Sequence, residues 1–328
     1  MRKHRYTLWL VLAIIVLAVY AVFNFKFFSG VSHGERRVTV ILETLNVQLD
    51  FWQAVHKGAE AAAKEMGLNV SVEGPLSEEG ADAQIQILEA AIERKPHAIV
   101  IAPIKDDRMP AVLAKAREAG IKLVVIHSSP NMQPSPVVVS SNHFEAGRLA
   151  GQTSIKETNG HPVLALISDN ENSAVSEERL VGMQLALADY KDSLMGIYYA
   201  DQSEDRAYLI AKQLITSGSP INTFITLNES ASLGVARVLK EQNRADDIRL
   251  IAFDSTGDEV QLLEAGIIKA SIVQKPFNMG YLGVKTALKL IEGDKTNPIT
   301  YMESNVITKE NMYTTENQKL LFPFINSK

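Results

Sequence analysis

Short apolar runs alternate with amphipathic segments along most of the chain. The first run, Val38 to Leu42, contains only β-branched and aliphatic residues, which predicts a strand covered on both faces. Apolar residues then recur at spacings of three and four, at Val55, Ala59, Ala62 and Met66, with charged residues on the opposite face. This spacing is typical of a helix that packs one face against a sheet.

The corner between this strand and this helix carries two adjacent aromatic residues. Asp50 is a preferred N-cap residue, so Phe51 and Trp52 are expected in the first turn of the helix. In open α/β sheets, ligands bind at the carboxyl ends of the strands, where such a corner lies. The two rings either present flat apolar faces to a ligand or cap the local core.

The alternation continues to the end of the chain with short connections, which indicates parallel βαβ units. Further strands are predicted at residues 69–73, 98–102, 122–126, 137–140, 163–167, 195–199, 223–227, 249–253, 270–273 and 306–308. Further helices are predicted at residues 80–94, 109–119, 144–156, 176–188, 206–217, 231–242, 258–264 and 279–292. Two successive runs without a low-complexity linker predict two similar α/β lobes, and the count of units puts their boundary near Ser140 to His143.

The N-terminus has the pattern of a membrane segment. Residues 1–5 are basic, and Leu8 to Phe23 is uninterrupted apolar sequence. With its flanks this run reaches the roughly 17 to 25 residues that span a bilayer, and the basic cluster predicts a cytoplasmic N-terminus. A cleaved signal ending near Ala21 is the alternative, but the apolar run continues past that residue, which favours a retained anchor.

Composition excludes several classes of protein. The net charge of −5 argues against a general nucleic-acid binder. The absence of cysteine excludes disulfides, thiolate metal sites, cysteine nucleophiles and a lipobox. The seven histidines are scattered without metal-ligand spacing, and no GxGxxG, GxxxxGK[ST], HExxH or GxSxG motif occurs. We therefore expect no cofactor, no metal and no catalytic residues.

Polar residues directly follow several of the predicted strands. His127 follows LVVI, Asn228 follows FITL, Asp254 follows LIAF and Gln274 follows SIV, while Arg179 lies on the helix after LALI. Each residue alone is explained as a helix cap, a structural histidine or an arginine whose charged end reaches solvent. Their joint placement at one sheet edge, beside the aromatic pair, predicts a shared cleft.

Five segments in this order resemble the type 1 periplasmic sugar-binding proteins, the ribose-binding-protein-like group that shares its core with the lac repressor. The segments are DFWQAVHKGAEAAAKEMG, SEERLVG, TLNESASLGVARVL, LIAFDSTGDE and ASIVQKPFNMG. The resemblance covers about Val38 to Val306. It implies an α/β fold of two similar Rossmann-like lobes with parallel sheets, joined by a hinge.

The resemblance also implies ligand-binding roles for individual residues. In the family, paired aromatics corresponding to Phe51 and Trp52 stack on the sugar ring. Arg179, Asn228 and Asp254 match the family's ligand arginine, asparagine and aspartate. The hinge glutamine of the family corresponds to Gln274, and His127 is the remaining candidate contact.

The chain departs from the family pattern at two places. His127 and Ser128 stand where family members often carry an Asp-Arg pair. The aromatic residue that commonly covers the other sugar face has no clear equivalent near Ser203 to Arg206. These departures leave the identity of the sugar open and permit a ligand that is not a sugar.

We expect residues 1–28 to form the anchor or signal and residues 29–37 a linker. Residues 38–141 and 274–303 are predicted to form the N-terminal lobe, and residues 142–273 and 304–328 the C-terminal lobe. The linker reaches at most about 30 Å, so a retained anchor keeps the lobes close to the membrane. The expected localisation is a single-pass membrane protein with its binding domain outside the cytoplasm.

Two roles fit this reading. In the first, the protein closes on a small sugar and delivers it to the membrane permease of an ABC importer. In the second, the anchored protein presents its ligand state to a sensor histidine kinase. An apolar N-terminus in place of a basic helix-turn-helix argues against a repressor. An enzyme with Asp254 and His127 as an acid–base pair is a further alternative, and turnover of a bound sugar would distinguish it.

Overall fold

The computed structural model describes residues 36–46, 50–76, 80–128, 130, 132–168, 171, 173–190 and 192–322. The predicted anchor at residues 1–28 lies outside these residues, and so does most of the predicted linker. None of the helices within the described ranges combines the length and the apolar character that crossing a bilayer requires.

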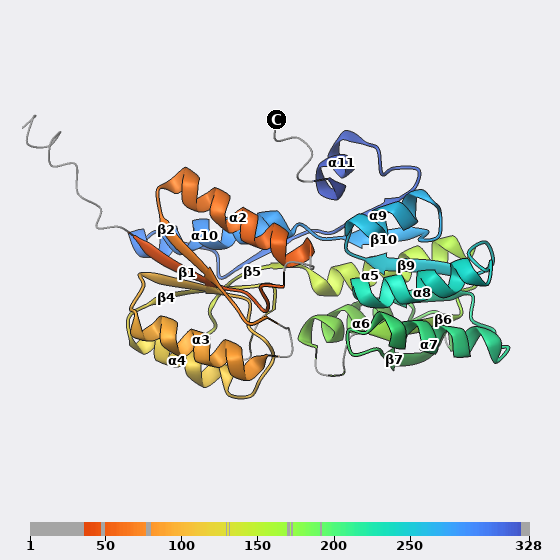
Figure 1. The fold of residues 1–328 in the computed structure, drawn as a ribbon, viewed down its shortest axis with the longest axis horizontal. Helices are drawn as coiled ribbons and strands as arrows, with labels where there is room; N and C mark the ends of the chain where they lie inside the picture. Colours follow the sequence, from red (N-terminus) through yellow and green to blue (C-terminus); the bar gives the residue numbers. More distant parts are fainter. Residues whose placement is uncertain are drawn as a thin grey trace, which may run out of the picture.

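Two six-stranded sheets form two lobes that lie side by side (Figure 1). The first sheet has the order β11-β5-β4-β3-β1-β2, and all of its strands run parallel. Its strands are β1 (Arg37–Ile41), β2 (Asn69–Glu73), β3 (Ala98–Ile101), β4 (Lys122–Ile126), β5 (Val137–Ser141) and β11 (Ile299–Met302). This parallel sheet is what the near-continuous apolar runs predict.

The second sheet has the order β12-β10-β9-β8-β6-β7. Its strands are β6 (Leu164–Ser168), β7 (Leu194–Tyr199), β8 (Thr223–Thr226), β9 (Arg249–Phe253), β10 (Ala270–Val273) and β12 (Asn305–Thr308). The prediction of parallel sheets is wrong for one strand, because β12 runs antiparallel to β10. The chain leaves β10 and enters β12 at the same edge of the second sheet, the edge where it crosses between the lobes, so the two strands run in opposite directions.

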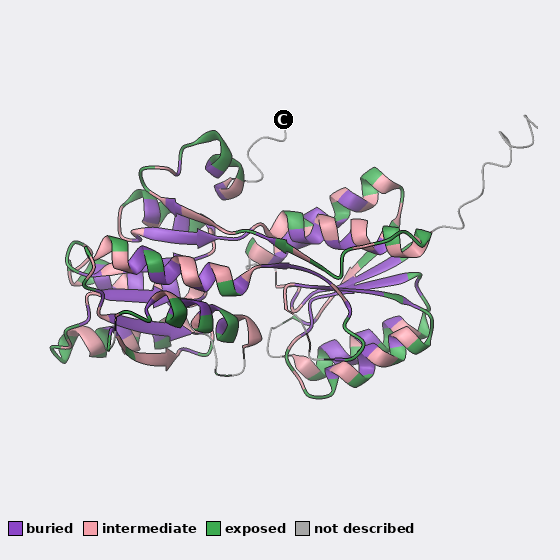
Figure 2. Cartoon of the chain, turned by 180° about the vertical axis from the view of Figure 1, so that it is seen from behind, coloured by how far each residue is buried: buried purple, intermediate pink, exposed green. Residues whose placement is uncertain are grey.

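Helices cover both faces of each sheet, and the buried positions follow the strands (Figure 2). The first sheet is covered by α2 (Asp50–Met66), α3 (Ala81–Glu93), α4 (Met109–Glu118) and α10 (Pro276–Glu292). The second is covered by α5 (His143–Glu157), α6 (Ala174–Ala186), α7 (Glu204–Thr216), α8 (Glu229–Glu241), α9 (Gly257–Glu264) and α11 (Thr315–Leu321). The prediction of two α/β lobes is therefore confirmed.

Between residues 36 and 322 the chain crosses between the lobes three times. It leaves the first sheet between Ser141 and His143, returns between Val273 and Pro276, and leaves again between Met302 and Asn305. The sequence pattern did not reveal β11, a strand of only four residues, three of which are not buried. The first and third crossings are joined by a hydrogen bond of 3.1 Å from Asn142 N to Met302 O.

Three helix pairs in the described part of the chain pack backbone to backbone through glycines: α2 with α10, α5 with α6, and α7 with α8, where Gly234 lies against Glu204 O. A Cβ atom added at Gly280 of α10 would lie 1.9 Å from Val55 O of α2. A Cβ atom at Gly147 of α5 would lie 1.8 Å from Arg179 O of α6. No side chain fits at such distances, so glycine is required where these helices touch. The packing of α5 on α6 therefore positions the backbone of Arg179 relative to the second sheet.

The substitution Gly147→Ala is expected to lower the free energy of unfolding by about 3 kcal/mol, because α5 and α6 must separate to admit the methyl group. Urea denaturation of the variant and the wild type measures this difference. Gly257→Ala is the matched control, because a Cβ atom there meets no atom of the described residues within 4 Å. Equal stability of the Gly147 and Gly257 variants would contradict the close packing described here.

Candidate functional site

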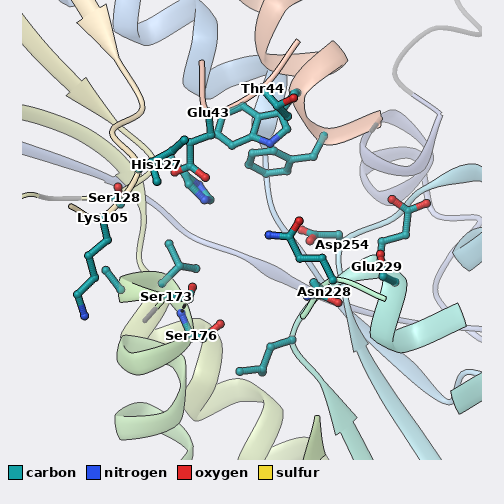
Figure 3. A pocket seen from close by; sticks show the side chains of 18 of the residues that line it. Glu43, Thr44, Lys105, His127, Ser128, Ser173, Ser176, Asn228, Glu229 and Asp254 are labelled. Carbon is teal, nitrogen blue, oxygen red and sulfur yellow. Dashed lines mark hydrogen bonds between the residues drawn. The ribbon is translucent and has the colours of Figure 1, made fainter. Parts of the chain in front are cut away.

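A cleft of about 580 Å³ lies between the lobes, at the carboxyl ends of both sets of parallel strands (Figure 3). The structure brings together in its lining all seven residues that the sequence nominates, namely Phe51, Trp52, His127, Arg179, Asn228, Asp254 and Gln274. Their roles as ligand contacts stay a prediction, but their common location is a feature of the fold.

The first lobe contributes an aromatic wall. Phe51 and Trp52 lie edge to face with their ring centroids 5.0 Å apart. The His127 ring lies 5.1 Å from the Phe51 ring and 5.2 Å from the Trp52 ring. Trp52 is only 4% exposed and belongs to the core of this lobe, whereas Phe51 is half-buried. Core packing and a face toward the cleft are therefore combined in this pair.

His127 has an unusual backbone conformation. Its φ of 68° lies in the left-handed region, which few residues other than glycine adopt. Its carbonyl oxygen accepts hydrogen bonds from Ser140 Oγ and, at 2.8 Å, from His143 Nε2. Burial and the charge of Arg179 lower the pKa of His127 to about 3. The imidazole is therefore neutral at physiological pH.

The second lobe contributes a buried cation. Arg179 is 3% exposed, its Nη1 donates to Leu227 O at 2.7 Å, and its guanidinium lies 4.2 Å from the centre of the Phe253 ring. The helix that carries it, α6, begins behind the N-cap Ser173, whose hydroxyl accepts from Ser176 N. Arg179 lies in the second turn of this helix, where it reaches the ends of β8 and β9.

Asp254 and Gln274 form a hydrogen-bonded pair at the second crossing. Gln274 Nε2 donates to Asp254 Oδ1 at 2.6 Å. Burial raises the pKa of Asp254, while Arg179 and the hydrogen bond from Gln274 oppose that rise. Gln274 is 3% exposed, and its Oε1 has no hydrogen-bond partner among the described residues. This oxygen is therefore an acceptor that a ligand can use.

Asn228 has two roles that the sequence offered as alternatives. It is the N-cap of α8, where its Oδ1 accepts from Ala231 N at 2.9 Å. It also lines the cleft. The cap engages the oxygen, and the Nδ2 group is left as the donor.

The chain matches the family described as periplasmic binding protein domain over residues 40–295. It belongs to the periplasmic binding protein family. Ribose import binding protein RbsB of Escherichia coli (strain K12) is 21% identical over 273 residues, which are 83% of this chain and 90% of that protein.

Solved structures of solute-binding proteins share the fold. One is a carbohydrate transporter solute binding protein from Agrobacterium radiobacter in complex with D-arabinose. It is 26% identical, has a TM-score of 0.82, and the match covers 88% of this chain and 99% of that one. A sugar transporter from Clostridium phytofermentans is 31% identical, with a TM-score of 0.76 and coverage of 83% and 98%.

Several cleft residues of this periplasmic binding protein were missed from the sequence. Glu43 and Thr44 follow β1, Lys105 follows β3, and Ser176 lies in the first turn of α6. Most follow the same rule as the nominated residues, since they stand just beyond strand ends, but their side chains are common surface types. Within the described residues, the second lobe places no phenylalanine, tyrosine or tryptophan in the cleft, and Val175 and Leu227 line it there.

Side-chain contacts between described residues join the lobes across the cleft. Asp50 Oδ2 accepts a hydrogen bond of 3.3 Å from Gly257 N, at the start of α9. Lys105 Nζ lies 3.5 Å from Glu177 Oε2 of α6. Asp50 was predicted to be an N-cap, but it is the first residue of α2 and its carboxylate reaches the other lobe. The lobes therefore touch in this structure.

Glu229 is a carboxyl group at the start of α8 that the sequence did not single out. Burial raises its pKa from 4.5 to about 7, and the nearby carboxylates of Asp254, Asp50 and Asp258 add to this effect. A hydrogen bond with Thr256 opposes it. Asp50 is the contributor from the other lobe, so approach of the lobes increases the negative charge around Glu229.

The raised pKa of Glu229 predicts a specific pH dependence of stability. Between about pH 4.5 and pH 7 the folded protein holds a proton on Glu229 that the unfolded chain has lost. The free energy of unfolding therefore falls as pH rises through this window. Glu229→Gln removes this contribution, so its stability relative to the wild type is expected to increase from pH 5 to pH 8. Urea unfolding at several pH values tests this.

Glu145→Gln is the control for that experiment. Hydrogen bonds from Arg148 lower the pKa of Glu145, so its contribution is fully present above pH 4.5 and is lost only in more acidic solution. The stability difference between this variant and the wild type is expected to stay constant from pH 5 to pH 8. A constant difference for the Glu229 variant as well would show that Glu229 does not titrate in this window.

Proposed function

We propose that this protein is an extracytoplasmic solute-binding protein that binds a small sugar in the interlobe cleft, closes on it, and serves an ABC-type sugar importer. The observation that carries the proposal is the composition of the two walls. An aromatic wall from the first lobe faces a wall of charged and amide groups from the second lobe. A sugar has the matching surfaces, since its C–H faces are apolar and its edge carries hydroxyls.

The energies of these contacts support a hydrogen-bonded ligand. Packing of a sugar ring on Phe51 and Trp52 is worth roughly 0.5–1.5 kcal/mol per aromatic contact beyond the area buried. Micromolar binding requires about 8 kcal/mol, which stacking alone does not reach. Hydrogen bonds to charged groups, at about 1.5–3 kcal/mol each, supply much of the rest. We assign Asp254 to accept from hydroxyls and Arg179 to donate to hydroxyl or ring oxygens.

The neutral and amide groups complete the site. His127 presents an uncharged imidazole, and Asn228 presents the Nδ2 donor that its capping role leaves over. Gln274 Oε1 is a buried acceptor without a partner in the described part of the chain. A polyhydroxylated ligand can donate to this oxygen and accept from Asn228 at the same time.

Closure follows from the placement of these groups on both lobes. A ligand that touches Phe51 on one lobe and Asp254 on the other makes all its contacts only when the cleft is shut. It therefore favours the closed state by its differential affinity for the two states. The permease of the importer is then the partner that distinguishes the closed, loaded protein from the open one.

The proposed ligand class is a pentose or hexose. RbsB is a ribose import binding protein, and the Agrobacterium radiobacter protein was solved with D-arabinose. A cleft of about 580 Å³ has room for one such sugar and ordered water. His127 and Ser128 in place of a charged pair remove two charges from this position of the first lobe, and we expect that difference to affect which sugar fits.

A second candidate function rests on the N-terminal sequence. The apolar run Leu8 to Phe23 and the nine-residue linker 29–37 would hold the binding lobes at the outer face of the membrane. In this arrangement the closed state is presented to a sensor histidine kinase, in place of or beside a permease. The cleft and its ligand are the same in both roles.

The substitution Asp254→Asn tests the site. Asparagine tolerates the left-handed backbone at this position, where φ is 77°, so the fold is expected to remain. Loss of hydrogen bonds to a charged group is expected to weaken sugar binding by about tenfold or more. A thermal-shift screen of aldopentoses and aldohexoses identifies a stabilising sugar for the wild type, and titration calorimetry then compares the two proteins.

Asp258→Asn is the matched control, because Asp258 is exposed, carries the same charge on α9, and does not line the cleft. It is expected to bind the sugar as the wild type does. Undiminished binding by the Asp254 variant would show that the site is misassigned. Absence of a shift with every sugar in the panel would contradict the sugar proposal itself.

Transport and sensing are separated in cells. We expect the wild-type protein to stay in the membrane fraction after an alkaline wash and to retain residues 1–28 in its intact mass. Loss of radiolabelled sugar uptake on deletion of the gene assigns transport. Unchanged uptake with loss of sugar-dependent phosphorylation of a histidine kinase assigns sensing and contradicts the importer role.

A further inference from the structure

The two lobes repeat one detail at the cleft. His127 follows β4 and Asp254 follows β9, and both have a left-handed backbone, with φ of 68° and 77°. In each case the carbonyl oxygen accepts a hydrogen bond from a serine hydroxyl on the neighbouring strand, Ser140 of β5 or Ser271 of β10. A non-glycine residue in this conformation persists only where its surroundings hold it.

In each case a residue at a crossing between the lobes makes a second hydrogen bond to the left-handed residue. At the second crossing, Gln274 binds the side chain of Asp254. At the first crossing, His143 binds the backbone of His127, with 2.8 Å between His143 Nε2 and His127 O. The difference matters, because a bond to the carbonyl leaves the His127 imidazole available to the cleft.

The chemistry of this contact fixes the state of His143. A carbonyl oxygen only accepts, so His143 Nε2 carries the hydrogen. The residue is 2% exposed, and burial together with the charge of Arg179 lowers its pKa well below the ordinary value. The two imidazole rings lie edge to face, with centroids 5.3 Å apart. His143 is therefore a neutral donor packed against the ring that it positions.

The His127 ring is enclosed by three other rings, those of Phe51, Trp52 and His143. Its Nδ1 is buried and has no hydrogen-bond partner among the described residues. Figure 3 shows its side chain in the cleft lining. A buried polar atom of this kind is costly unless something pairs with it, and a ligand hydroxyl is a suitable partner.

We propose that His143 is a positioning residue, which holds the His127 backbone from the first crossing and so aims the His127 imidazole at the ligand before the cleft closes. The part of this inference that concerns ligand binding rests on the proposed function. His143 is the first residue of α5 in the second lobe, whereas His127 belongs to the first. A bond at a crossing lies near the axis about which the lobes turn, where relative displacement is smallest.

A spectroscopic test needs no ligand. The chain has two tryptophans, Trp9 and Trp52, so the full-length Trp9→Phe protein in detergent reports Trp52 alone. The His127 ring lies 5.2 Å from Trp52, so its displacement changes the emission of that residue. In this background, His143→Leu is expected to shift or quench the emission. His143→Gln keeps a donor at similar reach and is expected to restore the wild-type spectrum.

The ligand arm uses whichever panel sugar stabilises the wild type. His143→Leu is expected to weaken its binding about tenfold, which corresponds to about 1.4 kcal/mol, and His143→Gln to stay within about threefold of the wild type. The melting temperature of the sugar-free protein is measured for each variant. A loss of affinity in a variant that melts as the wild type does separates positioning from general destabilisation.

His97→Leu is the matched control, since it removes another bond between an imidazole and the backbone, from Arg37 N to His97 Nδ1, at the opposite end of the same sheet. It is expected to leave the spectrum and the affinity unchanged. An unchanged spectrum for His143→Leu, or no rescue by His143→Gln, would overturn the positioning role. If no sugar binds the wild type, the proposed function fails, while the fluorescence comparison still decides the role of His143.

Discussion

The buried guanidinium of Arg179 is the charge on which the cleft depends. An isolated cation inside a protein is unfavourable unless hydrogen bonds and opposite charges compensate it. Here the carbonyl of Leu227, the face of Phe253 and the carboxylate of Asp254 do so. Burial lowers the pKa of His127 and of His143, and the charge of Arg179 adds to this effect, so both imidazoles are neutral. The same charge opposes the rise that burial causes in the pKa of Asp254.

The position of Arg179 is in turn a packing result. Gly147 and Gly182 let α5 and α6 approach until their backbones touch, and Arg179 lies at that contact. The backbone of Arg179 is therefore held by a rigid helix pair. Its guanidinium stays buried, whereas the guanidinium of a surface arginine can extend into solvent. A fixed cation suits a binding site, because little side-chain entropy remains to be lost when a ligand arrives.

The two walls of the cleft carry different chemical groups, and this difference determines the orientation of a bound ligand. The first lobe offers rings and a neutral imidazole, and the second offers Arg179, Asp254 and the amide of Asn228. The crossings tie both walls to the hinge, since His143 bonds to His127 and Gln274 bonds to Asp254. A ligand held by its polar groups on the second lobe is thus covered by the first when the lobes approach.

Sequence reasoning located most of this site for one reason. Parallel strands place the residues after their carboxyl ends at one edge, so a rule about strand ends identifies cleft residues without knowledge of the tertiary structure. The rule reached His127, Asn228, Asp254 and Gln274, and the helix pattern reached the aromatic pair. It passed over Glu229 and His143, whose importance comes from neighbours far away in the chain, such as Asp50 for one and the His127 carbonyl for the other.

The sequence by itself determined the two α/β lobes and the identity of the residues at their facing edges, because apolar periodicity and strand ends are local signals. Only the tertiary structure decided that β11 joins the first sheet and β12 pairs antiparallel in the second, because the partner and direction of a strand depend on where the chain crosses between the lobes. It also decided that His127 is neutral, because burial and the charge of Arg179 lower the pKa of its imidazole. Burial and contacts between residues distant in the chain cannot be derived from local sequence signals.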